Sequence, residues 1–271
     1  MPPELISSPA NPLLRRIRKL RQRKHRDAEG ALFVEGIAVV WQALESDARV
    51  EIVVTAPDLL TSAGARDLVA GLPARGVRVA ALTADAFAAV AEREHPAGLG
   101  AVVQTPRRGL RDLTVDASSL VVGLHEVGNP GNLGTIVRTA DAAGAAGVVV
   151  AGESADAWHP AAVKASMGTV FSTPVVTASL DELLAWARDG GLPVVATSAR
   201  GKAAHWDAAF PERCVLLFGS EATGLAEAVL HDADLTVRIP QAGAASSLNL
   251  AVAAGVLIYE ARRGRIEPAK P

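Results

Sequence analysis

The second half of the chain contains a series of short, mostly apolar runs separated by longer and more polar segments. The runs occupy residues 120–125, 147–152, 193–198, 215–218 and 234–239. Apolar runs of this length predict buried strands, and several of the segments between them carry helical spacing. Alternation of strand and helix predicts an α/β fold with a parallel sheet, in which ligands bind beyond the carboxyl ends of the strands.

The composition agrees with this fold class. The chain has 271 residues, of which 49% are hydrophobic and only 4% aromatic, so two domains packed with small residues are expected. The single cysteine, Cys214, excludes an internal disulfide framework, and its apolar neighbours predict a buried, unreactive thiol. The start of the sequence has no signal-peptide pattern and no apolar run reaches membrane-spanning length, so we expect a cytoplasmic protein. The six histidines lack ligand spacing, and no metal site is expected.

A dense basic run near the N-terminus is expected to form one face of a helix whose other face is apolar. The cations that we expect to bind RNA are Arg15, Arg16, Arg18, Lys19 and Arg23. Like charges this close repel one another, and a polyanion would offset that cost; a solvated helix face is the alternative interpretation. Alternating short strands and helices follow, with one helix placed at about residues 84–94. They predict a small α/β substrate-binding domain over residues 1–105 and a second domain over residues 106–271.

A glycine-rich turn at residues 128–134 lies between a predicted strand and a predicted helix, and Glu153 ends the next strand. This order imitates a dinucleotide-binding unit, so a nicotinamide-dependent oxidoreductase is one hypothesis. The imitation is incomplete, because the glycines follow the pattern GxxGxxG rather than GxGxxG. In addition, Asn132 and Arg138 occupy positions where a pyrophosphate-binding loop needs neither residue.

The stretch from residue 239 to residue 250 connects the last predicted strand to the last predicted helix. Pro240 ends the strand because it has no N–H to give to the ladder, and helical spacing places the helix start near Ser246 or Ser247. Small residues at 242–245 would leave backbone N–H and C=O groups open to a flat ligand. An ordinary capped helix is the other interpretation of this stretch.

Three motifs in the second half resemble the signature motifs of the SpoU/TrmH family, the RNA 2'-O-methyltransferases of the SPOUT class. The motifs are Asn132-x-Gly134-x-x-x-Arg138, Phe218-Gly219-x-Glu221-x-x-Gly224-Leu225, and Ile239-Pro240 through Ser247-Leu248-Asn249. They stand in the family's order and cover residues 119–263 as a whole. The N-terminal module, with Phe33-Val-Glu-Gly36 after the basic run, is similar to the L30e-like substrate-binding domain of many family members.

This resemblance implies a parallel sheet whose C-terminal segment threads a loop as a deep trefoil knot, a topology otherwise nearly absent from proteins. It also implies S-adenosylmethionine as cofactor, RNA as substrate, and a homodimer whose interface completes each active site. The residues that it assigns to the cofactor are Thr197, Ser198, Gly219, Ile239, Gln241 and Leu248. The residues that it places around the reacting groups are Asn132, Arg138, Glu221, Ser247 and Asn249.

The family assigns activation of the ribose 2'-hydroxyl to Arg138. The pKa of a guanidinium lies far above neutral pH, so the group is always charged and is a poor base. We therefore expect Arg138 to hold the adjacent phosphate and to stabilise the developing alkoxide, while another group takes the proton. The expected substrate is 23S ribosomal RNA; transfer RNA as substrate and a non-catalytic RNA-binding protein are the alternatives.

Overall fold

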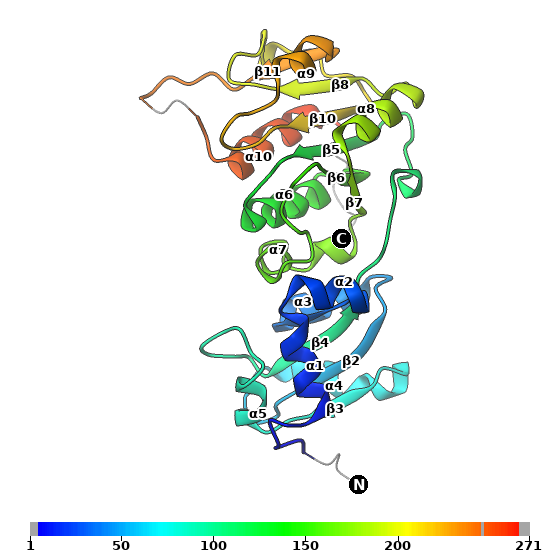
Figure 1. Ribbon diagram of the computed structural model, residues 1–271, viewed down its shortest axis with the longest axis vertical. Coiled ribbons are helices and arrows are strands. Elements are labelled where there is room, and N and C mark those ends of the chain that lie inside the picture. The colour runs from blue at the N-terminus through cyan, green and yellow to red at the C-terminus, as the bar shows by residue number, and fades with distance from the viewer. Residues whose placement is uncertain (1–4, 245–246, 266–271) are drawn as a thin grey trace. The chain divides into compact units, whose positions relative to one another are not determined.

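The structure is a computed structural model that describes residues 5–244 and 247–265. The chain divides into two compact units, residues 1–106 and residues 107–271 (Figure 1). Each unit has its own sheet, its own helices and its own buried apolar residues. No helix among the described residues is long and apolar enough to cross a membrane.

The N-terminal unit is built on a four-stranded sheet in the order β1-β4-β2-β3. Its strands are β1 (Ala31–Glu35), β2 (Val50–Thr55), β3 (Val79–Ala81) and β4 (Leu99–Gln104). Strand β4 runs antiparallel to β1 and β2, whereas β2 and β3 are parallel. The helices are α1 (Pro12–Leu20), α2 (Arg23–Glu29), α3 (Ile37–Glu45), α4 (Ala63–Gly71) and α5 (Ala84–Ala88), with a 3-10 turn, η1 (Pro73–Arg75).

Helix α1 carries the first part of the basic run and packs its apolar side into the core of this unit. Leu14, Ile17 and Leu20 are buried there, while the cations take the remaining positions around the helix. The basic run is not one helix, because α1 ends at Leu20 and α2 begins at Arg23. The helix predicted over residues 84–94 is also too long: it ends at Ala88, and the chain then turns so that the backbone N–H of Glu92 donates to Glu35.

The C-terminal unit is built on a seven-stranded sheet in the order β7-β6-β5-β10-β8-β11-β9, with every pair parallel. Its strands are β5 (Leu120–His125), β6 (Gly147–Ala151), β7 (Val175–Ala178), β8 (Val194–Thr197), β9 (Ala203–Ala204), β10 (Cys214–Phe218) and β11 (Leu235–Arg238). The predicted α/β fold with a parallel sheet is confirmed. Strands β7 and β9, at the two edges, are additions that the apolar pattern did not predict.

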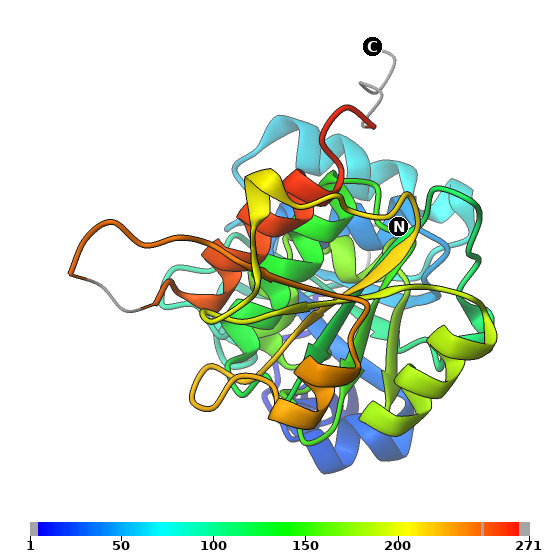
Figure 2. The ribbon, with the colours of Figure 1, turned by 90° about the horizontal axis from the view of Figure 1, so that it is seen from above.

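Helices cover both faces of this sheet (Figure 2). They are α6 (Pro130–Ala142), α7 (Pro160–Ala165), α8 (Leu180–Asp189), α9 (Glu227–Asp232) and α10 (Leu250–Ala261), with the 3-10 turns η2 (Leu110–Asp112), η3 (Thr169–Phe171) and η4 (His205–Asp207). Helix α6 packs between α7 and α10 on one face, and α8 and α9 lie on the other. A side chain at position 134 would collide with the carbonyl of Ala162, so Gly134 allows the close approach of α6 and α7.

The strand order decides which loops meet. Strand β10 lies between β5 and β8, and β11 is the next neighbour of β8. Because these strands are parallel, the segments that follow them gather beyond the carboxyl ends of the strands, at one end of the sheet. Cys214 is the first residue of β10 and so lies at the opposite end of the sheet. It is buried as predicted, and burial raises the pKa of its thiol to about 11.

Candidate active site

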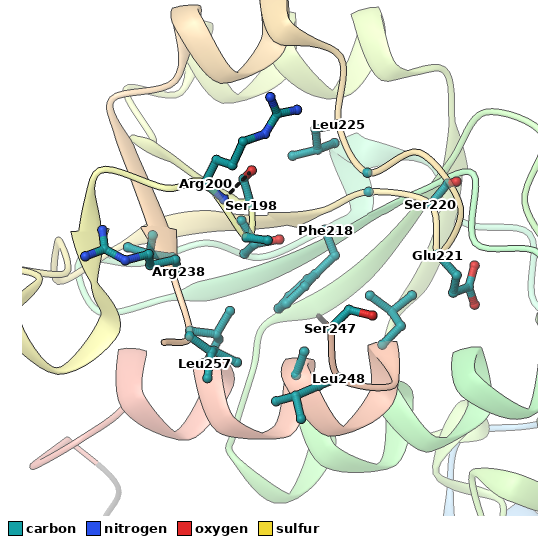
Figure 3. A pocket seen from close by; sticks show the side chains of 18 of the residues that line it. Ser198, Arg200, Phe218, Ser220, Glu221, Leu225, Arg238, Ser247, Leu248 and Leu257 are labelled. Atoms are coloured by element: carbon teal, nitrogen blue, oxygen red, sulfur yellow. Dashed lines mark hydrogen bonds between the residues drawn. The ribbon is translucent and has the colours of Figure 1, made fainter. Parts of the chain in front are cut away.

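A cavity of about 560 Å³ opens at the carboxyl ends of the central strands (Figure 3). Four segments and Leu230 of α9 line it. The segments are Thr197–Arg200 at the end of β8, Phe218–Leu225 around the turn after β10, Val237–Gln241 at the end of β11, and Ser247–Leu257 before and within α10. Its volume lies within the range of about 300–1,000 Å³ that is usual for small-molecule sites. The end of the sheet predicted from strand polarity is therefore the end that carries the cavity.

The walls of the cavity combine a broad apolar surface with a few hydroxyl groups. Phe218, Leu248 and Leu257 supply apolar surface, and Thr197 and Ser198 supply hydroxyls. The residues that the family resemblance assigns to the cofactor all line this cavity: Thr197, Ser198, Gly219, Ile239, Gln241 and Leu248. The fold thus brings together six positions that are spread over some fifty residues of sequence.

The turn after β10 folds back on itself and needs glycine at its first position. A side chain at Gly219 would collide with the carbonyl carbon of Gly224, and the turn is closed by the Gly224 N–H donating to the Ser220 carbonyl at 2.9 Å. Gly224 itself has a φ of +70°, a left-handed conformation that favours glycine. The two glycines of the motif therefore shape the loop that presents Glu221 at the rim of the cavity.

A chain of hydrogen bonds joins one residue from each of the three motifs. The side-chain amide of Asn132 donates to Glu221 Oε1 at 3.0 Å, and that of Asn249 donates to Asn132 Oδ1 at 3.1 Å. These residues come from the first turn of α6, the turn after β10 and the start of α10, up to 117 residues apart in sequence. The chain of bonds holds three separate loops in one arrangement.

The direction of these bonds follows from the charge of Glu221. Burial alone raises the pKa of Glu221, but hydrogen bonds from the Asn132 side chain and from nearby backbone N–H groups outweigh it, so the net pKa is lowered. An ionised carboxylate only accepts hydrogen bonds, so Asn132 must turn its NH₂ group toward Glu221 and its oxygen toward Asn249. Asn249 then has to donate, which leaves its own oxygen as an acceptor.

That free oxygen caps the last helix. Asn249 Oδ1 accepts from the backbone N–H groups of Ala251 and Val252 at 2.9 and 3.3 Å. The prediction that this helix starts near Ser246 or Ser247 is wrong, since α10 begins at Leu250; Ser246 itself, like Ala245 of the small-residue loop, lies outside the described residues. Asparagine and serine are both strong N-caps, so local preference alone does not distinguish Asn249 from the serines before it.

Asn129 is a residue of the site that the motif comparison did not single out. Its side chain caps α6 by accepting from the N–H groups of Gly131 and Asn132 at 2.8 and 3.1 Å. Its own backbone N–H, with that of Gly128, lies among the donors to Glu221. The sequence contained the signal, because asparagine followed by proline is a helix start with a cap and proline at the first position.

Ser247 and Arg138, both expected at the reacting groups, differ in their position relative to the cavity. Ser247 lines the cavity, whereas Arg138 lies on the exposed side of α6 and does not line it. Six residues along a helix separate Arg138 from Asn132, which is about 120° around the axis and about 9 Å along it. Among the described residues, no hydrogen bond or ion pair engages the Arg138 guanidinium, so it is available to an outside anion.

The glycine-rich turn at residues 128–134 takes no part in lining the cavity. Gly134 serves the packing of α6 on α7, and the backbone N–H of Gly128 donates to Glu221 at 3.3 Å. The cavity lies instead beside Gly219 and Leu248. This position differs from the one that a nicotinamide cofactor would require in the oxidoreductase hypothesis.

The five basic residues expected to bind RNA differ in their partners. Arg16 forms ion pairs with Glu29 and Glu51, both at 2.7 Å, and Arg18 donates to the carbonyls of Pro9 and Leu14. Arg15 and Lys19, one helical turn apart, are exposed, and no partner engages them within the described part of the chain. Arg23 is exposed and 3.5 Å from Asp27, a separation at which solvent weakens the pair.

Comparison with known proteins identifies the class. The model of the SpoU rRNA Methylase family matches residues 119–259, and that of the MRM3-like substrate binding domain matches residues 11–101. The chain belongs to the SpoU rRNA methylase family, and the resemblance seen in its three motifs is confirmed.

Relatives align over nearly the whole chain. The chain is 35% identical to the 23S rRNA (uridine(2479)-2'-O)-methyltransferase of Streptomyces viridochromogenes, over 91% of this chain and 88% of that protein. It is 33% identical to the 23S rRNA (guanosine(2553)-2'-O)-methyltransferase RlmP of Bacillus subtilis, over 95% and 98%. Among solved structures, the AdoMet-bound rRNA methyltransferase from Sinorhizobium meliloti superposes with a TM-score of 0.86 at 34% identity, covering 97% of this chain and 99% of that one.

Proposed function

We propose that the chain transfers a methyl group from S-adenosylmethionine to a ribose 2'-hydroxyl of 23S ribosomal RNA in the cytoplasm. The observation that carries the proposal is the cavity itself. Its walls come from the second and third family motifs together with the segment after β8, and its rim is tied to the first motif by the Glu221–Asn132–Asn249 chain. Support also comes from the relatives, whose names describe 2'-O-methylation of 23S ribosomal RNA.

The residues of the cavity fit this cofactor. Phe218, Leu248 and Leu257 offer apolar surface to a purine, and Thr197 and Ser198 offer hydroxyls to its polar edge or to a ribose. When bound, S-adenosylmethionine supplies a methyl group on a sulfonium, which a nucleophile attacks in line. The task of the protein is then mainly to hold the nucleophile and the donor in this geometry.

The Glu221–Asn132–Asn249 chain fixes the loops around that geometry. Glu221 is ionised and already accepts several hydrogen bonds, so its role is to position Asn132 and the start of α6 rather than to remove the hydroxyl proton. Ser247 and Asn249 line the cavity, and we assign them to contacts with the donor or the ribose. Arg138, as a permanent cation, holds an RNA phosphate and stabilises the alkoxide as it develops.

The position of Arg138 supports a homodimer in which each subunit completes the site of the other. Helix α10, which packs on α6, exposes a row of apolar side chains at helical spacing: Val252 (53% exposed), Val256 (37%) and Tyr259 (47%). An apolar row of this kind on a helix surface is typical of an interface between subunits. In such a two-fold dimer we assign Arg138 of one subunit to the cavity of the other, because Arg138 does not line the cavity of its own subunit.

The path of the chain after β11 supports the trefoil knot. Ile239 and Gln241 line the cavity after β11, and the chain lines it again from Ser247 into α10, which packs on α6. The segment after β8 lines the same cavity, so both ends of the connection from β11 to α10 lie beside an earlier loop. Figure 2 shows the chain leaving the sheet after β11 and returning to α10 beside α6.

Methyl transfer from labelled S-adenosylmethionine tests the function directly. The purified protein is expected to label 23S ribosomal RNA prepared without this modification, with the label at one 2'-O position. Total transfer RNA is the matched substrate control. Label on transfer RNA alone would move the substrate to that class, and no cofactor binding by calorimetry would favour the non-catalytic RNA-binding alternative.

The two groups of basic residues in α1 predict different behaviour on RNA. Replacing Arg15 and Lys19 by alanine removes two unpaired cations, so the slope of log affinity against log salt should fall by about 1.4–1.8. Replacing Arg16 and Arg18 instead removes internal ion pairs and hydrogen bonds, and should lower thermal stability with little change in slope. Filter binding over a salt series measures the slope, and equal slopes for both double variants would contradict the assignment.

A further inference from the structure

We infer that Arg200, at the rim of the cavity, is a positioning residue that binds a phosphate of the RNA substrate beside the target nucleotide. The inference rests on the proposed methyl transfer to RNA and adds a contact outside the three family motifs. Of the described residues that line the cavity, the cationic ones are Arg200 and Arg238. Their guanidinium groups are used in different ways.

Arg238 is committed to the protein. Its Nη1 donates to the carbonyls of Gly201 and Lys202 at 2.7 and 2.9 Å, so it ties the segment after β8 to the end of β11. Gly201 lies so close to Val237 that a side chain there would collide with the Val237 carbonyl carbon. Arg238 and Gly201 together hold this segment tightly against β11.

The turn that carries Arg200 is closed by two further hydrogen bonds. The backbone N–H of Arg200 donates to Ser198 Oγ at 3.2 Å (Figure 3), and that of Gly201 donates to the Ser198 carbonyl at 3.0 Å. The backbone at Arg200 is therefore held in place while its side chain is 87% exposed. In Figure 3 this side chain points away from Phe218 and Leu257, and so away from the floor of the cavity.

The partner of Arg200 in the free protein is a weak one. Its Nη2 lies 3.4 Å from Glu227 Oε1, and the Glu227 side chain is 79% exposed. Solvent screens an ion pair this exposed, so it contributes little and is easily exchanged for another anion. A phosphate accepts two parallel hydrogen bonds from one guanidinium, which makes it the stronger partner.

The charges around the cavity favour an RNA phosphate as this anion. Glu221 puts a carboxylate on the rim, and a polyanionic strand that approaches it needs a compensating cation. Arg200 supplies one from a rigid turn that also carries Ser198, a wall of the cavity. The same residue thus relates the position of the RNA strand to the site where the methyl donor binds.

The test compares Arg200→Ala, Arg200→Lys and Glu227→Gln with Arg188→Ala, an exposed arginine on α8 that does not line the cavity. For Arg200→Ala we expect kcat/KM for RNA to fall about tenfold and the salt slope of RNA binding to fall by about 0.7–0.9, with cofactor Kd unchanged within twofold. Arg200→Lys should keep the slope and recover part of kcat/KM. Glu227→Gln should tighten RNA binding several-fold at low salt.

Three outcomes would overturn the inference. A weaker cofactor Kd in Arg200→Ala with an unchanged RNA slope would assign Arg200 to the carboxylate of the cofactor. If kcat/KM and the salt slope of Arg200→Ala equal those of Arg188→Ala, Arg200 forms only a surface ion pair and does not bind RNA. The same conclusion would follow if Glu227→Gln binds RNA with the affinity of the wild type. Wild-type protein that methylates no RNA would refute the proposed function instead, so the two failures are distinguishable.

Discussion

Arg138→Ala is expected to lower the rate of methyl transfer by about a hundredfold to a thousandfold, the loss usual when one group that stabilises a developing oxyanion is removed. Cofactor affinity should stay within twofold of wild type, because Arg138 lies outside the cavity. The folded state should be unaffected, since Arg138 is exposed and no partner holds it in the described part of the chain. Single-turnover transfer and calorimetry measure the two quantities, and near-wild-type turnover would contradict the assignment.

Mixing of inactive variants shows which subunit supplies Arg138. If it acts on the cavity of the partner, then subunits of Arg138→Ala and Glu221→Gln that exchange will form heterodimers with one complete site. Random exchange in equal amounts should then restore about a quarter of wild-type activity, since about half of the dimers are mixed and each has one good site. If Arg138 acts on its own cavity, both sites of the mixed dimer are defective and activity stays at the level of the separate variants.

Asn132→Asp is expected to be nearly inactive at pH 8 and to recover, relative to wild type, as the pH falls toward 6. The substitution places a second carboxylate about 3 Å from Glu221, where the two charges repel each other and the pair holds a proton at higher pH than either would alone. Once that proton is bound, an O–H group replaces the N–H that Asn132 donates in the wild type. The ratio of the two rates across pH measures the effect.

Asn132→Ala serves as the control, because it has no proton to gain and its ratio to wild type should stay flat. In the wild type, a fall in pH has the opposite effect, because it weakens the hydrogen bonds of Glu221 instead of restoring one. The pKa of Glu221 is lowered in the folded protein, so the stabilisation from its hydrogen bonds is present at neutral pH and is lost only as the pH falls through that lowered value. A pH-independent ratio for Asn132→Asp would show that Glu221 and position 132 do not share a proton.

The sequence predicted the central strands of the C-terminal unit because their apolar runs are unbroken. The pattern failed at the edges, where β7 and β9 are short and β9 spans only two residues. It also failed at the start of α10, where the serines at 246 and 247 and the asparagine at 249 all have capping side chains. Asn249 is chosen because the bond from its NH₂ group to Asn132 turns its oxygen toward the helix, a tertiary contact that local patterns do not contain.

The family motifs predicted which residues gather around the cavity, but not how they interact. That Glu221 accepts from Asn132, and that Asn132 accepts from Asn249, depends on strand order and on two loops meeting across 89 and 117 residues of sequence. For the basic run, the sequence showed the charge but not which cations are paired within the protein. Its charge was evident in the sequence, yet only the fold shows that Arg16 is neutralised by Glu51 on β2, while Arg15 one residue earlier is free of such a partner in the described chain.

Two arginines at the end of α10 affect the order in which the two units can fold during synthesis. Arg262 donates to the carbonyls of Ala143 and Ser118, and Arg265 donates to those of Phe210 and Pro211. These bonds close spans of up to 144 residues, so they form only after nearly all of the C-terminal unit has been synthesised. The N-terminal unit has its own core and can fold earlier, which would let it meet RNA while the methyl-donor pocket still lacks its last wall.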